Sequence, residues 1–432
     1  MSTVASLPVA PGALPLIGHA FEMMRDPLKF LASLPRYGDL VVIRLGPVPA
    51  VVVCDPELTT KIFRNEKYFG KGGFVYEKVR ELLTGEYGLV TCPYESHMRL
   101  RRMISPVFGS KTIGLYESAM REEWAATCDS WSNGQVVDLL HEATRTNVRI
   151  GERSLFSGSL TPEQSARWSE DLSTLLDGAF ARMILPDFVR WVPYPANIRF
   201  NRARKRLDAS CREIIANRRN SGKSYHDLLA ELMTVREGGS LTDQELKDNI
   251  MTFFFGATDT ASSSIANTLY LVSVDAALER DVVSEIRSVA DPRERKLVSL
   301  ALTETLRMYP PVYLLTRQAE GDDVYLMNCH IPAGTTLVVS PFVLHHRADL
   351  FPEPEVYNPE RWVDWKEKRP GSMVPFGAGA RKCPGDDYGM LDSIIAVSTI
   401  LSRFRLHPVS AFKQSPRTVL NPGDLRMRVE VR

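Results

Sequence analysis

The sequence lacks paired cysteines, a net charge of either sign and any long hydrophobic run. Its 432 residues include six cysteines, which are scattered and form no Cys-x-x-Cys pair. This spacing predicts neither a disulfide framework nor a zinc cluster, and it favours the reducing cytoplasm. The 53 basic and 52 acidic residues leave a formal charge of +1. We therefore expect no nucleic-acid partner, because no overall field attracts one.

The N-terminal segment shows no secretion signal. Residues 1–20 are rich in proline and glycine and have no basic cluster before an apolar stretch. No later segment approaches the roughly 18 uninterrupted apolar residues that a membrane-spanning helix needs. The sequence therefore predicts a cytoplasmic protein without a membrane anchor.

The patterning along residues 1–432 indicates a single domain that is mainly α with small β-sheets. Two β-branched runs predict a hairpin over residues 40–54, and further short strands follow Pro311 and close the chain. Glycines in 69–91 predict an irregular loop. The helical patterns cover residues 56–68, 95–130, most of 140–235, and about thirty residues from Leu241 that are apolar on most sides.

A lone cysteine stands in the stretch "FGAGARKCPG", residues 376–385. Its glycines allow a flat group to approach the backbone closely. Arg381 favours a thiolate and can also pair with an anionic group of a ligand. The helical pattern after Pro384 places the thiol of Cys383 just before a helix N-terminus, which stabilises negative charge. These features indicate a reactive or ligating thiolate rather than a structural thiol.

The pattern Phe-x-x-Gly-x-Arg-x-Cys-x-Gly in this stretch resembles the haem-binding signature of the cytochrome P-450 family, in its soluble bacterial type. The resemblance implies the family's fold, with haem b between a long central helix and the cysteine loop. It implies that the Cys383 thiolate is the axial ligand of the iron. The other haem contacts that it implies in this loop are Phe376, Gly377, Arg381 and Gly385.

Glu304 and Arg307 lie three residues apart, on one face of a predicted helix. They resemble the ExxR motif of the family, which pairs with an arginine in a later Pro-Glu-Arg segment. That segment is present as "NPERW", where Arg361 matches. The resemblance implies a structural role for these three residues, not a catalytic one.

The stretch "GATDT", residues 256–260, places an acid and a hydroxyl inside an apolar helix. Both are costly there unless they are hydrogen-bonded or functional. The stretch resembles the oxygen-activation motif of the family, which implies that Asp259 and Thr260 deliver protons for O–O cleavage. Ala257 stands where the family usually has glycine. A threonine bonded back to its own helical turn is an alternative that can coexist with this role.

His97 and Arg101 lie four residues apart on a predicted helix, so both can hold acidic groups of one ligand. Bacterial members of the family hold the haem propionates with His-x-x-x-Arg. Arg317 matches a further propionate-binding position. His345 and His346 receive no role from the sequence.

Substrate contacts, by analogy with the family, fall at residues that are mostly apolar or aromatic. They are Phe74, Val75, Tyr76, Met183, Leu185, Phe188, Phe254, Gly256, Ala257, Val312 and Leu315. Such a lining suits a neutral, hydrophobic substrate, for example a terpenoid or an indole-containing natural product. Core packing explains each of these positions equally well.

The resemblance implies an EC 1.14-type monooxygenase of secondary metabolism, which uses O₂ and two electrons to oxidise a hydrophobic small molecule. The chain leaves no room for a fused electron-transfer domain, so a separate ferredoxin and ferredoxin reductase are expected, with the protein as a monomer. The same haem could instead drive C–N or C–C ring closure, or desaturation. A non-catalytic haem-thiolate sensor or carrier is the other alternative, although it would not need the protons of Asp259 and Thr260.

Overall fold

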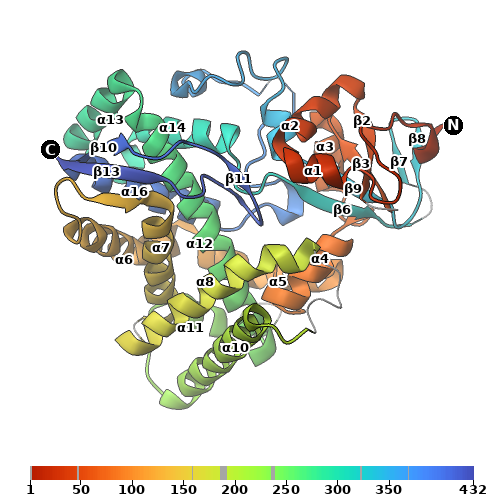
Figure 1. Cartoon of the computed structure of the whole chain (residues 1–432). Helices are drawn as coiled ribbons and strands as arrows, with labels where there is room; N and C mark the ends of the chain where they lie inside the picture. Colours follow the sequence, from red (N-terminus) through yellow and green to blue (C-terminus); the bar gives the residue numbers. More distant parts are fainter. Residues whose placement is uncertain are drawn as a thin grey trace. The chain divides into compact units, whose positions relative to one another are not determined.

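The chain folds into two compact units in a computed structural model. The structure describes residues 2–45, 48–157, 159–184, 192–234, 239–321, 324–367 and 369–432. The sheet unit consists of Met1–Glu77 and Thr303–Cys383, and the helical unit of Lys78–Leu302 and Pro384–Arg432. Figure 1 follows the chain through both units.

The sheet unit is built on a five-stranded sheet with the order β2-β3-β9-β6-β4. Its first two strands form the predicted antiparallel hairpin, in which Leu40 lies opposite Val53. A second sheet has the order β1-β8-β7. The strands are β1 (Ser2–Thr3), β2 (Leu40–Leu45), β3 (Val48–Val53), β4 (Phe69–Gly70), β6 (Leu315–Ala319), β7 (Val324–Leu326), β8 (Cys329–Ile331) and β9 (Thr336–Val339).

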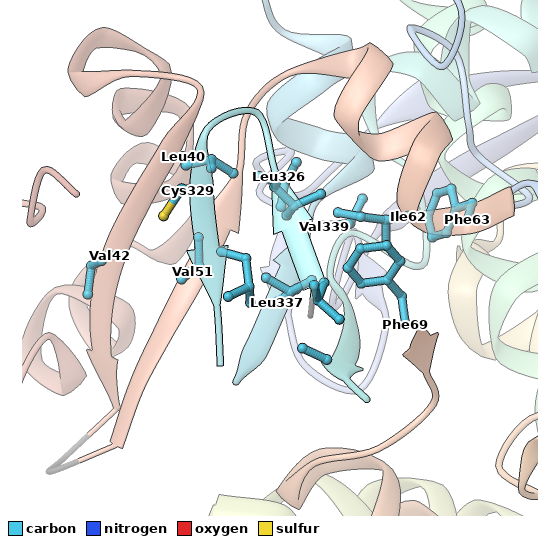
Figure 2. Close-up of a cluster of buried hydrophobic side chains, with 14 of the residues drawn as sticks. Leu40, Val42, Val51, Ile62, Phe63, Phe69, Leu326, Cys329, Leu337 and Val339 are labelled. Carbon is cyan, nitrogen blue, oxygen red and sulfur yellow. The ribbon is translucent and has the colours of Figure 1, made fainter. Parts of the chain in front are cut away.

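The core of this unit covers both faces of β3. Val51 and Val53 belong to one hydrophobic cluster and Val52 to another, because successive side chains of a strand point to opposite faces. Figure 2 shows the first cluster, in which Ile62 and Phe69 turn toward the strands. This packing fixes helix α3, which contains Ile62, against the sheet.

The helices of the sheet unit are short. They are α1 (Ala20–Arg25), α2 (Pro27–Ser33), α3 (Pro56–Arg64), α15 (Pro341–His345) and the 3₁₀ turns Val4–Ser6, Leu34–Tyr37, Pro359–Trp362 and Gly379–Arg381. Two further helices, α4 (Phe74–Val79) and α14 (Lys296–Met308), continue from one unit into the other.

The prediction of an irregular loop over residues 69–91 is wrong for its central part. Helix α4 and the π-helical turn Arg80–Thr84 occupy it. Glycines bound this helical segment instead of breaking it: Gly73 precedes it, and Gly85 follows it with φ +69°. Leu82 and Leu83 are buried, and this burial stabilises the helical turn.

The helical unit is organised around α12 (Asp243–Ser273), which the sequence predicts. Thr242 and Glu245 form a capping box: the Thr242 hydroxyl accepts from the Glu245 N–H at 3.2 Å, and Glu245 Oε2 accepts from the Thr242 N–H at 2.9 Å. Helix α7 lies beside α12, and α16 also packs against it (Figure 1).

The elements of the helical unit include two small sheets, of order β10-β13-β5 and β11-β12. Its helices are α5 (Tyr94–Ile104), α6 (Ser110–Asp129), α7 (Leu139–Phe156), α8 (Pro162–Ile184), α10 (Pro195–Ser221), α11 (Leu228–Met233), α12, α13 (Ala276–Ser288) and α16 (Asp386–Arg403), with 3₁₀ turns at Ser105–Phe108 and Pro292–Glu294. Its strands are β5 (Val136–Asp138), β10 (Phe404–Pro408), β11 (Ser415–Pro416), β12 (Leu420–Asn421) and β13 (Arg426–Val431). Within the described ranges, no helix has the length and apolarity that crossing a membrane requires.

Candidate functional site

The cysteine loop of the sheet unit is closed by backbone hydrogen bonds. The N–H of Cys383 donates to the carbonyl of Phe376 at 2.9 Å, and the N–H of Gly377 donates to the carbonyl of Val374 at 3.0 Å. The thiol of Cys383 is exposed, whereas the other five cysteines are buried. Helix α16 begins at Asp386, shortly after Cys383, as the sequence predicts. The loop therefore presents its thiol instead of burying it.

Two glycines of this loop, Gly377 and Gly379, have different surroundings. Gly377 and Gly379 both have left-handed backbone angles, with φ of +69° and +71°. A Cβ atom on Gly379 would lie 2.0 Å from the carbonyl oxygen of Phe63, so the loop presses against the end of α3. A Cβ atom on Gly377 would meet nothing within 4 Å. This open space beside the exposed thiol fits a flat ligand such as haem.

Arg381 forms an ion pair with Glu66, and both side chains are almost fully buried. The sequence predicts a haem propionate as the partner of Arg381 and gives no role to Glu66. Nothing in the sequence marks Glu66, because the pair joins residues that are far apart along the chain. The pair fastens the cysteine loop to the segment after α3, at the side where Gly379 also packs.

Arg317 lies near the same pair and is itself buried. Burial lowers the pKa of its guanidinium, the nearby charge of Arg381 lowers it further, and Tyr76 and Glu66 oppose this shift. Its Nη1 donates to the carbonyl of Thr316 at 2.8 Å. Arg317 and Arg381 thus place two guanidinium groups near the carboxylate of Glu66. Guanidinium groups are suitable donors for an acidic ligand group such as a propionate.

Glu304 and Arg307 form a fully buried, two-pronged ion pair. Arg307 Nε donates to Glu304 Oε2 at 2.9 Å and Arg307 Nη2 donates to Glu304 Oε1 at 2.8 Å. Arg361 Nε donates to Glu304 Oε1 at 3.4 Å, as the family motif implies. Trp362, which the sequence interpretation missed, donates its Nε1–H to Glu304 Oε2 at 2.9 Å. A buried carboxylate with this many donors suits the structural role that the resemblance implies.

His345 connects this ion pair to the cysteine loop. Its Nε2 accepts the backbone N–H of Val374 at 3.0 Å, and its Nδ1 lies 3.2 Å from the carbonyl oxygen of Arg307. The ring is fully buried, and burial lowers its pKa to about 3. The sequence shows His345 and His346 as an adjacent pair. It does not indicate the contacts of the His345 ring, because these are with residues far away along the chain.

Helix α12 of the helical unit is buried along most of its length but opens at its middle. Gly256 and Ala257 are exposed, and Asp259 and Thr260 are half-buried. The Thr260 hydroxyl donates to the carbonyl of Gly256 at 2.5 Å, so this threonine is bonded back to its own helical turn, which is one of the two arrangements that the sequence allows. The carbonyl oxygen of Gly256 therefore accepts a hydrogen bond from the Thr260 side chain. The exposed residues at the middle of α12, Gly256 and Ala257, are both small.

Asp259 carries the strongest electrostatic signal on this helix. Burial, and to a lesser extent the neighbouring acid Asp177 of α8, raise its pKa to about 7. A carboxyl group with this pKa holds a proton in part of the molecules at neutral pH. It can therefore donate and recover a proton under physiological conditions, as a general acid must.

The predicted anion-binding pair lies on α5 of the helical unit. His97 is buried and Arg101 is half-buried, one helical turn apart, as the sequence predicts. Gly385 precedes α16 in the same unit, and a Cβ atom there would lie 3.7 Å from the ring of Phe108, an ordinary contact. His97 and Arg101 thus belong to the helical unit, whereas Arg317 and Arg381 belong to the sheet unit.

The predicted substrate contacts divide into three groups. Gly256 and Ala257 are exposed, and Val312 and Leu315 are half-buried. The side chains of Phe74, Val75 and Met183, and the whole of Leu185 and Phe188, lie outside the described parts of the chain. The remaining two, Phe254 and Tyr76, are buried.

The surroundings of Phe254 and Tyr76 favour packing over substrate contact. Phe254 lies 4.9 Å from Trp168 and 5.8 Å from Phe156, ring centre to ring centre, in an aromatic cluster. Tyr76 hydrogen-bonds to Arg317 and helps to fix that guanidinium. Apolar character alone could not separate these residues from true substrate contacts, because core and ligand cavity use the same side chains.

Comparison with known proteins identifies the family to which the chain belongs. The sequence model of the family described as cytochrome P450 matches residues 8–427. The chain is 35% identical over 438 residues to pentalenene oxygenase of Streptomyces avermitilis, covering 98% of this chain and 97% of the relative. It is 35% identical to cyclooctatin synthase of Streptomyces melanosporofaciens over 98% of this chain and 95% of the relative.

A third relative, cyclooctat-9-en-7-ol 5-monooxygenase of Streptomyces melanosporofaciens, is 36% identical over 414 residues, which is 93% of this chain and 89% of the relative. The chain belongs to the cytochrome P450 family. It is therefore a haem-thiolate monooxygenase with the family's mainly helical fold. Members of this family use O₂ with electrons from redox partners.

Proposed function

We propose that Cys383 is the haem-iron ligand of this monooxygenase and that the enzyme oxidises a hydrophobic natural product. The observation that carries the proposal is the exposed Cys383 thiol, beside the open space over Gly377. A thiolate ligand gives haem the ability to activate dioxygen and to insert one oxygen atom into a substrate bond. The guanidinium groups of Arg317 and Arg381 in the sheet unit bind one haem propionate, and His97 and Arg101 in the helical unit bind the other.

The protons come from α12. Oxidation of a substrate C–H bond consumes O₂, two electrons and two protons, and it yields a C–OH group and one water molecule. Asp259, with its pKa of about 7, supplies and recovers protons. The hydroxyl of Thr260 passes them on when its O–H turns away from the carbonyl of Gly256, because it can then accept one hydrogen bond while it donates another. Small residues at 256 and 257 leave room beside α12 for a substrate.

The substrate in this proposal is a terpenoid. The exposed or half-buried candidates Ala257, Val312 and Leu315 are apolar, which suits a hydrocarbon skeleton. Two relatives are named for pentalenene and for cyclooctat-9-en-7-ol, which supports this choice over an indole-containing skeleton. We further propose that a separate ferredoxin with its reductase supplies the electrons, and that the protein acts as a cytoplasmic monomer.

The reduced protein under carbon monoxide tests the ligand. We expect the long-wavelength Soret band of a thiolate-ligated haem, and we expect Cys383→Ser to lose it. Cys128→Ala, which changes a buried thiol, is the control and should keep the band. A spectrum typical of histidine ligation in the unchanged protein, or a long-wavelength band that survives in Cys383→Ser, would remove Cys383 from the site.

Product analysis with a surrogate ferredoxin chain tests the reaction. A terpene hydrocarbon should gain one oxygen atom. Loss of two hydrogen atoms instead would identify ring closure or desaturation. Ligand binding without any ligand-stimulated consumption of NADPH would identify a sensor or carrier.

A further inference from the structure

A buried imidazole at the end of α15 has no part in the function described so far. His345 is fully buried and makes two hydrogen bonds with ring nitrogens that face different parts of the sheet unit. One bond reaches Arg307 on α14, and the other reaches Val374 at the entrance of the cysteine loop. The next residue, His346, has its Nδ1 2.9 Å from the carbonyl oxygen of Phe342, within its own helical turn.

The partners of His345 fix its tautomer. The backbone N–H of Val374 can only donate, so Nε2 must be the bare, accepting nitrogen. The carbonyl of Arg307 can only accept, so Nδ1 must carry the proton. A neutral ring satisfies both bonds, and the depressed pKa of His345 agrees with a neutral ring. Protonation of Nε2 would break the bond to Val374.

Both ends of this connection are firmly held. On α14, Arg307 returns a hydrogen bond from its Nη1 to the carbonyl of His345 at 2.9 Å, while it grips Glu304. At the loop, the carbonyl of Val374 accepts the N–H of Gly377 at 3.0 Å. The carbonyl of the neighbouring Phe376 then accepts the N–H of Cys383 at 2.9 Å. A continuous series of bonds thus runs from the buried ion pair to the thiol-bearing residue.

The loop needs such a fixed point, because its own backbone is permissive. Gly377 and Gly379 give it two residues with wide conformational freedom. Gly379 is held by its contact with α3, and Arg381 is held by Glu66. Among the described contacts, the entrance of the loop at Val374 is held by His345.

We propose that His345 is a positioning residue, which orders the cysteine loop by accepting the N–H of Val374. It acts through the backbone and touches neither ligand nor substrate. Its consequence for haem rests on the proposed function, because the loop affects the iron only if Cys383 is the ligand. Its consequence for the order of the loop does not depend on haem.

Two substitutions separate the two bonds of the ring. In His345→Gln, the side-chain oxygen reaches as far from Cβ as Nε2 does, so it can still accept from Val374 while the donor to Arg307 is lost. In His345→Asn, the side-chain amide matches Nδ1, so it can still donate to Arg307 while Val374 loses its acceptor. Each variant loses one buried hydrogen bond, so we expect similar falls in the thermal midpoint. His346→Asn is the control.

Amide hydrogen exchange in the purified, haem-loaded protein is the first measurement. We expect the peptide that spans residues 373–378 to exchange about fivefold faster in His345→Asn, as the loss of one hydrogen bond predicts. It should be nearly unchanged in His345→Gln and in His346→Asn. The ferrous carbon monoxide spectrum is the second measurement: His345→Asn should lose part of its long-wavelength band or its haem, and His345→Gln should keep both.

Equal effects of the Asn and Gln variants on exchange and on haem, including failure of both to fold, would overturn the proposal, since His345 would then only fill the core. If the unchanged protein lacks the long-wavelength band, the assignment of Cys383 fails. The exchange rates at residues 373–378 still decide the role of His345 in that case.

Discussion

Two carboxyl groups, one in each unit, have opposite electrostatic surroundings. Glu304 in the sheet unit is fully buried and accepts hydrogen bonds from Arg307, Arg361 and Trp362. Asp259 in the helical unit is half-buried, and its electrostatic neighbour is another acid, Asp177. Surrounding donors stabilise the charge of the first, while burial destabilises the charge of the second. The first therefore serves as a scaffold, and the second is available for proton chemistry.

Removal of the Glu304 carboxylate should have the largest effect on stability. Glu304→Ala leaves Arg307 as a buried charge without its partner. Breaking such a pair costs about 3–5 kcal/mol. We expect the free energy of unfolding to fall by this amount, measured by urea denaturation, or the variant to fail to accumulate as folded protein.

The matched control for Glu304 is a pair with the same spacing on a surface. Glu142 and Arg145 lie three residues apart on α7, with atoms 3.6 Å apart and more than half of the Arg145 side chain exposed. Glu142→Ala should change stability by less than about 1 kcal/mol. If the free energy of unfolding falls equally in Glu304→Ala and Glu142→Ala, burial does not explain the contribution of the Glu304–Arg307 pair to stability.

Loss of the Thr260 hydroxyl should be the next largest effect, and it should spare stability. Thr260→Ala removes the group that passes protons on α12, so electrons should be diverted into hydrogen peroxide. General acid–base groups contribute about 10²-fold or more. We expect the amount of product formed per NADPH consumed to fall by roughly this factor, about 10²-fold. Thr260→Ser keeps a hydroxyl and should retain most of the coupling; unchanged coupling in Thr260→Ala would take the residue out of the relay.

The two glycines of the cysteine loop offer a matched pair with the same backbone angle. Alanine at either position costs about 1 kcal/mol for the left-handed conformation. Gly379→Ala also forces a clash with the Phe63 carbonyl, so we expect a total loss of about 2–3 kcal/mol. Gly377→Ala meets no protein atom, and its larger effect should be a lower haem content. Haem titration and urea unfolding of both variants check this; equal stabilities would contradict the close packing of Gly379.

The sequence predicts several features that the structure shows, because they depend on local patterns. The hairpin of β2 and β3 follows from β-branched runs, helix α12 from a long apolar pattern that begins near Leu241, and the start of α16 after Cys383 from the helical pattern that follows Pro384. The ion pair of Glu304 follows from a known spacing together with Arg361. In each case the residues that determine the feature lie near one another in the sequence or belong to one motif.

The sequence does not predict contacts that only tertiary structure creates. Glu66 meets Arg381 across more than three hundred residues, and His345 meets Val374 through one backbone N–H, which leaves no compositional trace. Phe254 illustrates the converse: the sequence pattern makes its apolar ring a substrate candidate, but it does not predict the packing on Trp168 that the structure shows. The helical segment made of α4 and the turn Arg80–Thr84 is not predicted, because the glycines before and after it look like loop residues in a linear pattern.

Asp259 should produce the smallest effect, a change in the pH dependence of stability. Its pKa in the folded protein, about 7, lies above its ordinary value of 3.8. Between these values the folded state binds more protons than the unfolded state, so stability falls as pH rises through this window. Asp259→Asn does not titrate and removes this fall. Because the side chain is only half-buried, we expect Asn to gain about 1 kcal/mol relative to Asp between about pH 4 and pH 7.

The neighbouring acid provides the control for this last comparison. Asp177 raises the pKa of Asp259 by repulsion, so Asp177→Asn should lower that pKa and narrow the pH window without abolishing it. Urea denaturation of the three proteins at several pH values measures the slopes. A constant difference between Asp259→Asn and the unchanged protein across this range would mean that Asp259 is ionised throughout. It would then resemble the stabilised carboxylate of Glu304, and the proton relay would have to begin at another group.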